Sequence, residues 1–240
     1  MNTPYQKYLI LSVHRSGTNY LTSLLDSHPY IVSHYEVFRE YFFHGQHVFW
    51  KGIRWISPEY FLNRYVYHHY PGFIRAVGFE LQYSHARHGR EKSIWGYLHN
   101  HKEITIIHLK RMNLLRMYIS FLLATKSGIW TTTKERALPP TPIELDYDFC
   151  RMFFVYIEHK RSYFDGYFQH HNVKQLTYES LTANTTKELR SIQNFLSVPP
   201  LRLHSPLKKI NVYTLQQIIK NYSSLKRSFA QTAWARFFDE

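Results

Sequence analysis

The segment 13–20 combines residue types that bind anions. It reads Val-His-Arg-Ser-Gly-Thr-Asn-Tyr and joins a short apolar run to a helix-like pattern. The first turn of a helix has N–H groups without partners in the helix, and its dipole favours a negative charge nearby. Gly17 would let the backbone approach a phosphate, while Ser16 and Thr18 would add hydroxyl donors. Arg15 would add a permanent positive charge. The segment therefore predicts a phosphate-type anion site, with an ordinary helix start as the alternative.

This segment differs from the loop that binds nucleoside triphosphates. A Walker A loop has two glycines five residues apart, followed by Lys and then Ser or Thr. Residues 13–20 contain one glycine and no lysine. The later apolar run at 104–109 also lacks an aspartate that could hold magnesium. These differences argue against a nucleotide kinase of the P-loop type, which stays as the alternative. We predict instead a relative of that architecture that works without a metal.

Apolar runs alternate with helix-like patterns along the chain. Short runs rich in Ile, Val and Leu predict strands buried on both faces, at residues 8–13, 31–32, 76–81, 104–109 and 173–178. Apolar residues at three- and four-residue spacing predict helices at residues 18–25, 114–123, 146–168, 185–196 and 214–227. The alternation predicts one α/β domain over residues 1–240, with a mainly parallel central sheet flanked by helices.

Charge and composition exclude several classes of protein. Thirty Lys and Arg against 17 Asp and Glu give a net charge of +13, which attracts anionic partners. A single cysteine, Cys150, excludes a disulfide framework and a zinc site of several thiolates, and we expect no metal. The apolar stretch 104–124 is broken by three basic residues, and the stretch 8–13 is short for a secretory signal. We therefore expect a cytoplasmic protein whose only membrane association would be peripheral.

Three blocks of sequence follow one another in a distinctive order. Residues 14–21 join the first predicted strand to a helix, residues 107–116 run on to Ser120, and residues 176–181 precede another helix. In this order and spacing they resemble the sulfotransferases that depend on PAPS (3'-phosphoadenosine 5'-phosphosulfate). The match is to bacterial carbohydrate sulfotransferases of the trehalose and nodulation-factor types. It implies a P-loop-like sulfotransferase fold and transfer of the sulfuryl group of PAPS to a hydroxyl group, with no metal.

The resemblance also implies roles for matching residues. The loop Arg15–Thr18, with Asn19 beside it, would bind the 5'-phosphosulfate. Arg15 would neutralise charge on the bridging oxygen as the sulfuryl group leaves. Arg111 and Ser120 would bind the 3'-phosphate. Tyr178 would contact the nucleotide or, alternatively, be a strand-end tyrosine beside a capping carboxylate, Glu179.

One position departs from the pattern of the family. The arginine that binds the 3'-phosphate commonly stands eight residues before the serine, and here that position is Met112. Either Arg111 reaches the phosphate from a shifted turn, or Arg116 or a lysine near the C-terminus (Lys208, Lys209) takes its place. A solvated helix face is the alternative for both arginines.

Transfer to a hydroxyl group requires a residue that accepts its proton. Residues 33–38 follow the second predicted strand, which would place them at the carboxyl edge of the sheet beside the anion loop. Glu36 lies where the bacterial relatives carry their catalytic glutamate, so the resemblance implies Glu36 as the general base. His34 is the local competitor, since the cytosolic branch of the family uses histidine. Alternatively, Glu36 pairs with Arg39 on a surface turn.

We predict the acceptor by analogy, as a hydroxyl group of a saccharide or glycolipid. Aromatic residues would stack on its rings or, alternatively, form core; they are Phe42, Phe43, Phe49, Trp50, Trp55 and Tyr60. Positive charge and aromatic residues also suit a non-catalytic nucleic-acid-binding protein. The sequence contains no recognised nucleic-acid module, so we expect no nucleic-acid partner.

Overall fold

A five-stranded parallel sheet organises the part of the chain described by the computed structural model, which covers residues 5–38, 57–86, 93–134, 142–210 and 212–239. The strand order is β2-β3-β1-β4-β5, and every neighbouring pair is parallel. The strands are β1 (Gln6–Ser12), β2 (Ile31–Glu36), β3 (Ala76–Gln82), β4 (Thr105–Lys110) and β5 (Val173–Thr177). The predicted α/β fold with a mainly parallel sheet is confirmed.

The apolar runs form strands because the sheet is buried on both faces. In β1, Leu9, Ile10 and Leu11 have no exposed surface, although successive side chains point to opposite faces. Gly78 of β3 lies against the ring of Tyr8, and a Cβ added to Gly78 would stand 2.4 Å from a ring atom. The missing side chain at Gly78 therefore allows the buried Tyr8 ring to pack on β3.

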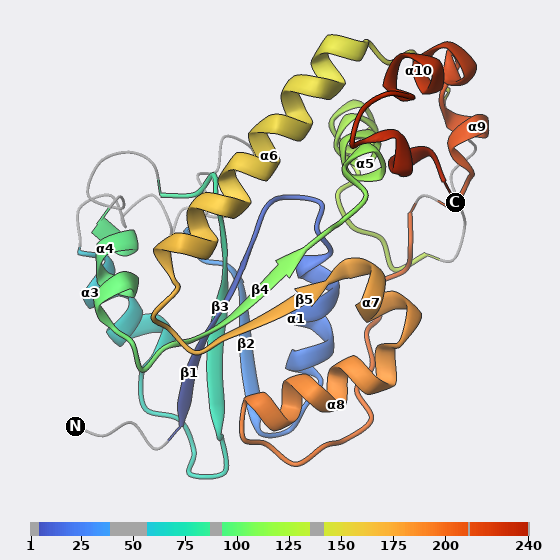
Figure 1. Cartoon of the computed structure of the whole chain (residues 1–240). Coiled ribbons are helices and arrows are strands. Elements are labelled where there is room, and N and C mark those ends of the chain that lie inside the picture. Colours follow the sequence, from blue (N-terminus) through green and yellow to red (C-terminus); the bar gives the residue numbers. More distant parts are fainter. Residues whose placement is uncertain (1–4, 39–56, 87–92, 135–141, 211, 240) are drawn as a thin grey trace. The chain divides into compact units, whose positions relative to one another are not determined.

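One face of the sheet is covered by three helices. These are α1 (Thr18–Asp26), α7 (Tyr178–Ala183) and α8 (Thr185–Phe195). Figure 1 shows α1, α7 and α8 together on one side of the sheet. A single apolar cluster joins these helices to the strands; its helical members are Leu21, Leu24, Leu25, Leu181, Leu189 and Ile192.

The opposite face is covered by aromatic side chains and by α3 (Pro58–Phe61), the π-helix Leu62–Val66 and α4 (Ser93–Asn100). The ring of Phe79 on β3 points away from the α1 side, because side chains alternate along a strand and Ala76 belongs to the α1 cluster. Phe38 lies 5.8 Å from Phe79 and 5.5 Å from Phe61, measured between ring centroids. Helices therefore flank both faces of the sheet.

The order of the strands reverses at β1. The chain passes from β1 to β2 on one side, and the connection from β3 to β4 then crosses to the other side of β1. In open parallel sheets, ligands bind outside the carboxyl ends of the strands at such a reversal. Residues 13–17, Glu36, Gln82 and Tyr178 stand at these carboxyl ends.

Contacts divide the chain into two compact units. The first contains residues 1–110 and 165–205, and with them the whole sheet. The second contains residues 111–164 and 206–240. Its helices are α5 (Leu114–Ser127), most of α6 (Tyr147–Tyr167), α9 (Leu215–Ile218), α10 (Tyr222–Phe229) and the 3-10 helix Ala235–Phe238. Its core gathers around Phe154, whose ring contacts the rings of Phe229, Trp234 and Phe237. A single domain over residues 1–240 stays a prediction.

Element boundaries differ from those expected from the sequence at several positions, most clearly at Glu36, Tyr178 and Ile219. β2 extends to Glu36, so Glu36 ends a strand rather than following one. Tyr178 begins α7 instead of ending β5, because the side chain of Thr177 caps the helix by accepting a hydrogen bond from the N–H of Ser180. The C-terminal helical pattern is interrupted at Ile219, which is extended and forms a β-bridge with Ile143.

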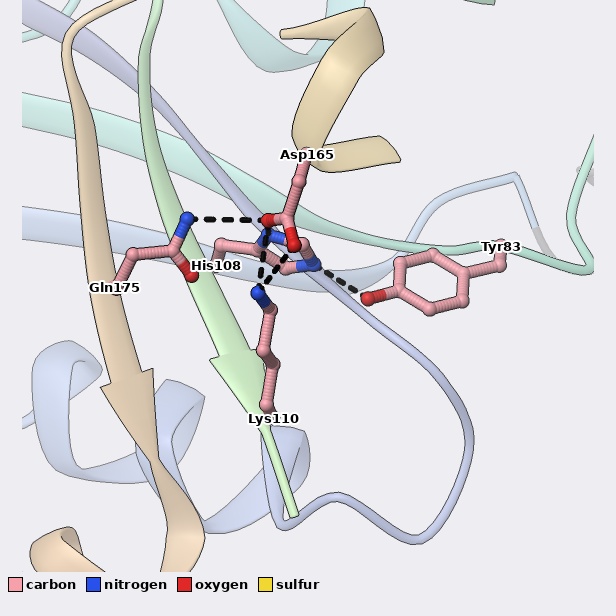
Figure 2. A network of polar contacts seen from close by, with 5 residues as sticks. All are labelled: Tyr83, His108, Lys110, Asp165 and Gln175. Carbon is pink, nitrogen blue, oxygen red and sulfur yellow. Dashed lines mark hydrogen bonds and ion pairs between the residues drawn. The ribbon is translucent and has the colours of Figure 1, made fainter. Parts of the chain in front are cut away.

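A polar network joins β4, β5 and the residue after β3 to the last turn of α6 (Figure 2). Asp165 receives hydrogen bonds from Lys110 Nζ at 2.8 and 2.7 Å and from Gln175 Nε2 at 3.2 Å. Its Oδ1 also lies 3.0 Å from Nδ1 of the buried His108. The other ring nitrogen, Nε2, hydrogen-bonds the hydroxyl group of Tyr83, which directly follows β3. The imidazole of His108 thus bridges Asp165 and Tyr83.

This network predicts how the stability of the protein depends on Asp165. Burial alone would raise the pKa of Asp165, but hydrogen bonds from His108 and Lys110, and the charges of those groups, lower it well below its usual range. Because the pKa of Asp165 is lower in the folded protein than in the unfolded chain, the ionised carboxylate stabilises the fold at pH values above 3.8, the pKa in the unfolded chain. This stabilisation is lost as the pH falls below 3.8 toward the pKa of the folded protein. Asp165→Asn should lower the free energy of unfolding at pH 7 by about 1 kcal/mol, since Asp165 is partly exposed.

Urea unfolding followed by circular dichroism at pH 7 and near pH 3.5 measures this difference. The difference should shrink at the lower pH, because near pH 3.5 the Asp165 carboxylate of the unfolded chain takes up a proton while that of the folded protein stays ionised. Asp239→Asn is the control, since the Asp239 side chain is 76% exposed. Equal stability of Asp165→Asn and the wild type at pH 7 would contradict the account.

Candidate active site

The loop between β1 and α1 has a backbone suited to binding an anion. Gly17 has a φ of 91° and Arg15 a φ of 63°, both in the left-handed region. Gly17 is also the N-cap of α1, and no side chain forms a capping hydrogen bond there. The first turn of α1 therefore directs its N–H groups and the positive end of its dipole to this loop. Ser16 and Thr18 are buried, whereas Arg15 and Asn19 are partly exposed.

The ring of Tyr178 packs directly against this loop. A Cβ added to Gly17 would lie 2.5 Å from Cδ2 of Tyr178, closer than two carbon atoms can approach. Glycine is therefore required twice at this position, by its left-handed φ and by the tyrosine ring. The contact brings the first residue of α7 to the start of α1, so two of the three sequence blocks meet here.

Glu36 and Gln82 form a second polar pair at the same edge of the sheet. Gln82 Nε2 donates a hydrogen bond of 2.5 Å to Oε1 of Glu36. Since β3 lies between β2 and β1, Glu36 stands two strand spacings, about 10 Å, from the end of β1. Glu36 and the anion loop therefore lie at the same edge of the sheet, with Gln82 of β3 between them.

His34, the competing candidate for a general base, has a different environment. Its Nε2 lies 3.0 Å from the hydroxyl oxygen of Tyr70. Burial lowers the pKa of His34, and the charge of Asp26 opposes this shift. His34 is therefore held against Tyr70, while the carboxylate of Glu36 is held by Gln82.

The second unit contains a group of cations that includes Arg111. Burial, and then the charge of Arg111, lower the pKa of Arg116. Burial likewise lowers the pKa of Lys209, with the charges of Arg116 and Arg111 adding to the effect. Ser120 stands one turn after Arg116 on α5, so the two residues share a face of the helix. Arg111, Arg116 and Lys209 thus concentrate positive charge in the unit that contains Ser120.

The sequence missed two residues of this region, Glu80 and Gln82. Both lie on β3, where they point to the same face because they are two residues apart. The signal in the sequence that could have indicated them is the presence of two polar residues in an otherwise apolar strand. Of the predicted aromatic acceptor residues, Tyr60 is exposed on α3. Phe42, Phe43, Phe49, Trp50 and Trp55 lie outside the described residues, as does Arg39, the proposed surface partner of Glu36.

Within the described ranges, no group of three or more His, Cys, Asp or Glu side chains could hold a metal ion. Burial raises the pKa of the Cys150 thiol to about 12, so this side chain behaves as a small apolar group. None of the helices in the described segments is both long enough and apolar enough to cross a bilayer.

Comparison with known proteins assigns the chain to a family. A family model described as "Sulfotransferase domain" matches residues 6–236. Two relatives named "Nodulation protein H" align along nearly their whole length. The protein from Rhizobium meliloti is 24% identical, with 98% of this chain and 96% of the relative covered. The protein from Rhizobium tropici is 23% identical, with 98% and 93% covered.

A solved structure supports the fold. The sulfotransferase from Alicyclobacillus acidocaldarius superposes with a TM-score of 0.54, covering 96% of this chain and 94% of the other at 13% identity. The match confirms the predicted P-loop-like sulfotransferase fold. Because the family model spans almost the entire chain and both relatives align end to end, the chain belongs to the sulfotransferase family and is an enzyme of sulfuryl transfer.

Proposed function

We propose that this enzyme transfers the sulfuryl group of PAPS to a hydroxyl group of a carbohydrate or glycolipid. The observation that carries the proposal is the left-handed Gly17 at the start of α1, with the Tyr178 ring packed against it. This backbone suits an anion with an attached base, because N–H groups face the loop and an aromatic ring lies beside it. The similarity to Nodulation protein H supports the resemblance of the sequence to sulfotransferases of the nodulation-factor type.

The residues of the loop would bind the 5'-phosphosulfate. The N–H groups of the first turn of α1 donate to its oxygens, and Ser16, Thr18 and Asn19 supply side-chain donors. Arg15 contributes a charge that no pH change in the working range removes. Arg111 and Ser120 would bind the 3'-phosphate. Arg116 and Lys209 would supply the positive charge that is missing because Met112 stands where the family commonly has an arginine.

The chemical step proposed is an in-line displacement at sulfur. The acceptor oxygen forms a bond to sulfur while its proton passes to the Glu36 carboxylate, which Gln82 holds in place. The bond between sulfur and the bridging oxygen breaks, and the electron pair leaves with PAP, the desulfated nucleotide. Arg15 neutralises the charge that develops on that oxygen. The step needs positioning and electrostatic stabilisation, and no group in it requires a metal.

We also propose that the enzyme acts in the cytoplasm, where it contacts anionic membrane surfaces only peripherally. The net charge of +13 supports such contacts, since basic residues are attracted to acidic lipid headgroups. A glycolipid acceptor would be reached in this way without a membrane-spanning segment.

Binding of the product nucleotide tests the proposed donor. Titration calorimetry should show that PAP binds at least about tenfold more tightly than ADP, because only PAP offers a 3'-phosphate to the cations of the second unit. Arg15→Ala should weaken PAP binding by about 10- to 100-fold, the value of a charged hydrogen bond. Arg190→Ala is the control, since Arg190 is exposed on α8. Equal affinities for PAP and ADP would remove the donor from the proposal.

The contact between Gly17 and Tyr178 gives a second prediction. Gly17→Ala should weaken PAP binding by about tenfold or more, because the new methyl group displaces the ring and the backbone is strained at a φ of 91°. Gly128→Ala is a matched control, with a φ of 71° and nothing within 4 Å of the added Cβ. Both variants should unfold at lower temperature, but only Gly17→Ala should lose affinity. Unchanged affinity in Gly17→Ala would show that the loop does not bind the nucleotide.

A further inference from the structure

Glu80 is a carboxylic acid buried on β3, close to the carboxyl edge of the sheet. It has no exposed surface, and β3 holds it between Ile10 of β1 and Glu36 of β2. One of its oxygens, Oε1, accepts a hydrogen bond from the hydroxyl group of Thr22 on α1. The other oxygen, Oε2, has no hydrogen-bond partner among the described residues. An ionised carboxylate would leave this oxygen charged and unsolvated, whereas a protonated carboxyl group carries no charge there.

The groups around Glu80 do not compensate a negative charge. Burial raises the pKa of Glu80 to about 8; the hydroxyl groups of Thr22 and Thr18 oppose this shift, and the Glu36 charge adds to it. Tyr8 on β1 and Tyr35 on β2 are titratable groups that interact with Glu80, and their own pKa values are raised, chiefly by burial. Asp26, the last residue of α1, acts on both tyrosines and raises their pKa values further. Each of these groups is an acid, so none of them carries a positive charge that would stabilise ionised Glu80.

Glu80 stands below the helix that begins at the anion loop. Thr18 is the first residue of α1 and Thr22 lies one turn later, so both face Glu80 from the same side of the helix. Glu36, the proposed general base, lies opposite Glu80 on the neighbouring strand. Because it is fully buried, Glu80 cannot touch an acceptor. Its contacts instead reach the two parts of the site that must be placed correctly.

We propose that Glu80 is a positioning residue of the active site. As a neutral carboxylic acid it holds the first turns of α1, and it places no negative charge beside the anion loop. The inference rests on the proposed function, in which that loop binds the 5' group of PAPS. If Glu80 loses its proton, a negative charge appears near the bound anion and the hydrogen bond from Thr22 changes. Binding of an anion to the loop therefore requires the protonated form of Glu80.

The dependence of PAP binding on pH tests the proposal. Wild-type affinity should fall as the pH rises through about 8, by about tenfold at one pH unit above the pKa of Glu80. Glu80→Gln, which is neutral at every pH, should bind PAP like the wild type at pH 7 and lose this fall. Lys209 also has a lowered pKa, but it is present in both proteins, so their difference isolates Glu80. Identical pH profiles of the two proteins would overturn the proposal.

Two further variants keep the test decisive if Glu80→Gln folds poorly. Thr22→Val removes the hydroxyl donor that stabilises ionised Glu80, so the midpoint of the affinity loss should move to higher pH. Glu59→Gln makes the same chemical change as Glu80→Gln at an exposed residue of α3 and should leave the profile unaltered. A midpoint that stays in place or falls in Thr22→Val would contradict the role of Glu80.

A measurement without ligand separates this inference from the proposed function. A pKa raised from 4.5 stabilises the fold fully below pH 4.5, and that stability is lost as the pH rises through about 8. The wild type should therefore lose stability relative to Glu80→Gln between these pH values, as measured by urea unfolding. Failure of PAP to bind any variant would refute the proposed donor. Parallel stability profiles would refute the neutral state of Glu80 whether or not PAP binds.

Discussion

The contact between Gly17 and the Tyr178 ring joins two segments that are 161 positions apart in the chain. Gly17 ends the loop after β1 and opens α1, while Tyr178 follows β5 at the far edge of the sheet. The ring can occupy this place only because Gly17 has no side chain and adopts a left-handed φ. The positive end of α1, the anion loop and an aromatic surface are thereby brought together, and the proposed nucleotide site depends on this arrangement.

The sheet explains why the remaining residues gather at the same edge. In a parallel sheet all carboxyl ends lie on one side, so residues that follow β1, β2, β3 and β5 share that side despite their distance in sequence. The insertion of β3 between β1 and β2 separates Glu36 from the loop and brings Gln82 to its carboxylate. The same strand places Glu80 under α1. β3 thus connects the anion loop to the proposed base.

The sequence predicted those features that depend on local pattern. Apolar runs buried on both faces predicted the strands, and residues 16–18 predicted a helix start with Thr18 as its cap, although Gly17 is the N-cap in the structure. Contacts between distant segments were not predictable in the same way. Nothing in the order of residues indicates that Gln82 reaches Glu36 or that Thr22 reaches Glu80, because both pairs are created by strand order. The network around Asp165 was missed for the same reason, since His108 lies within an apolar run and its partners come from other elements.

Transfer of label from PAPS tests the central claim most directly. The enzyme would be incubated without magnesium, with PAPS radiolabelled in its sulfate group and an oligosaccharide acceptor. We expect label on the oligosaccharide, a kcat at least about 100-fold lower for Glu36→Gln with little change in the KM for PAPS, and nearly wild-type kcat for His34→Gln. Absence of transfer by the wild type, together with magnesium-dependent turnover of ATP, would contradict the account and favour a nucleotide kinase.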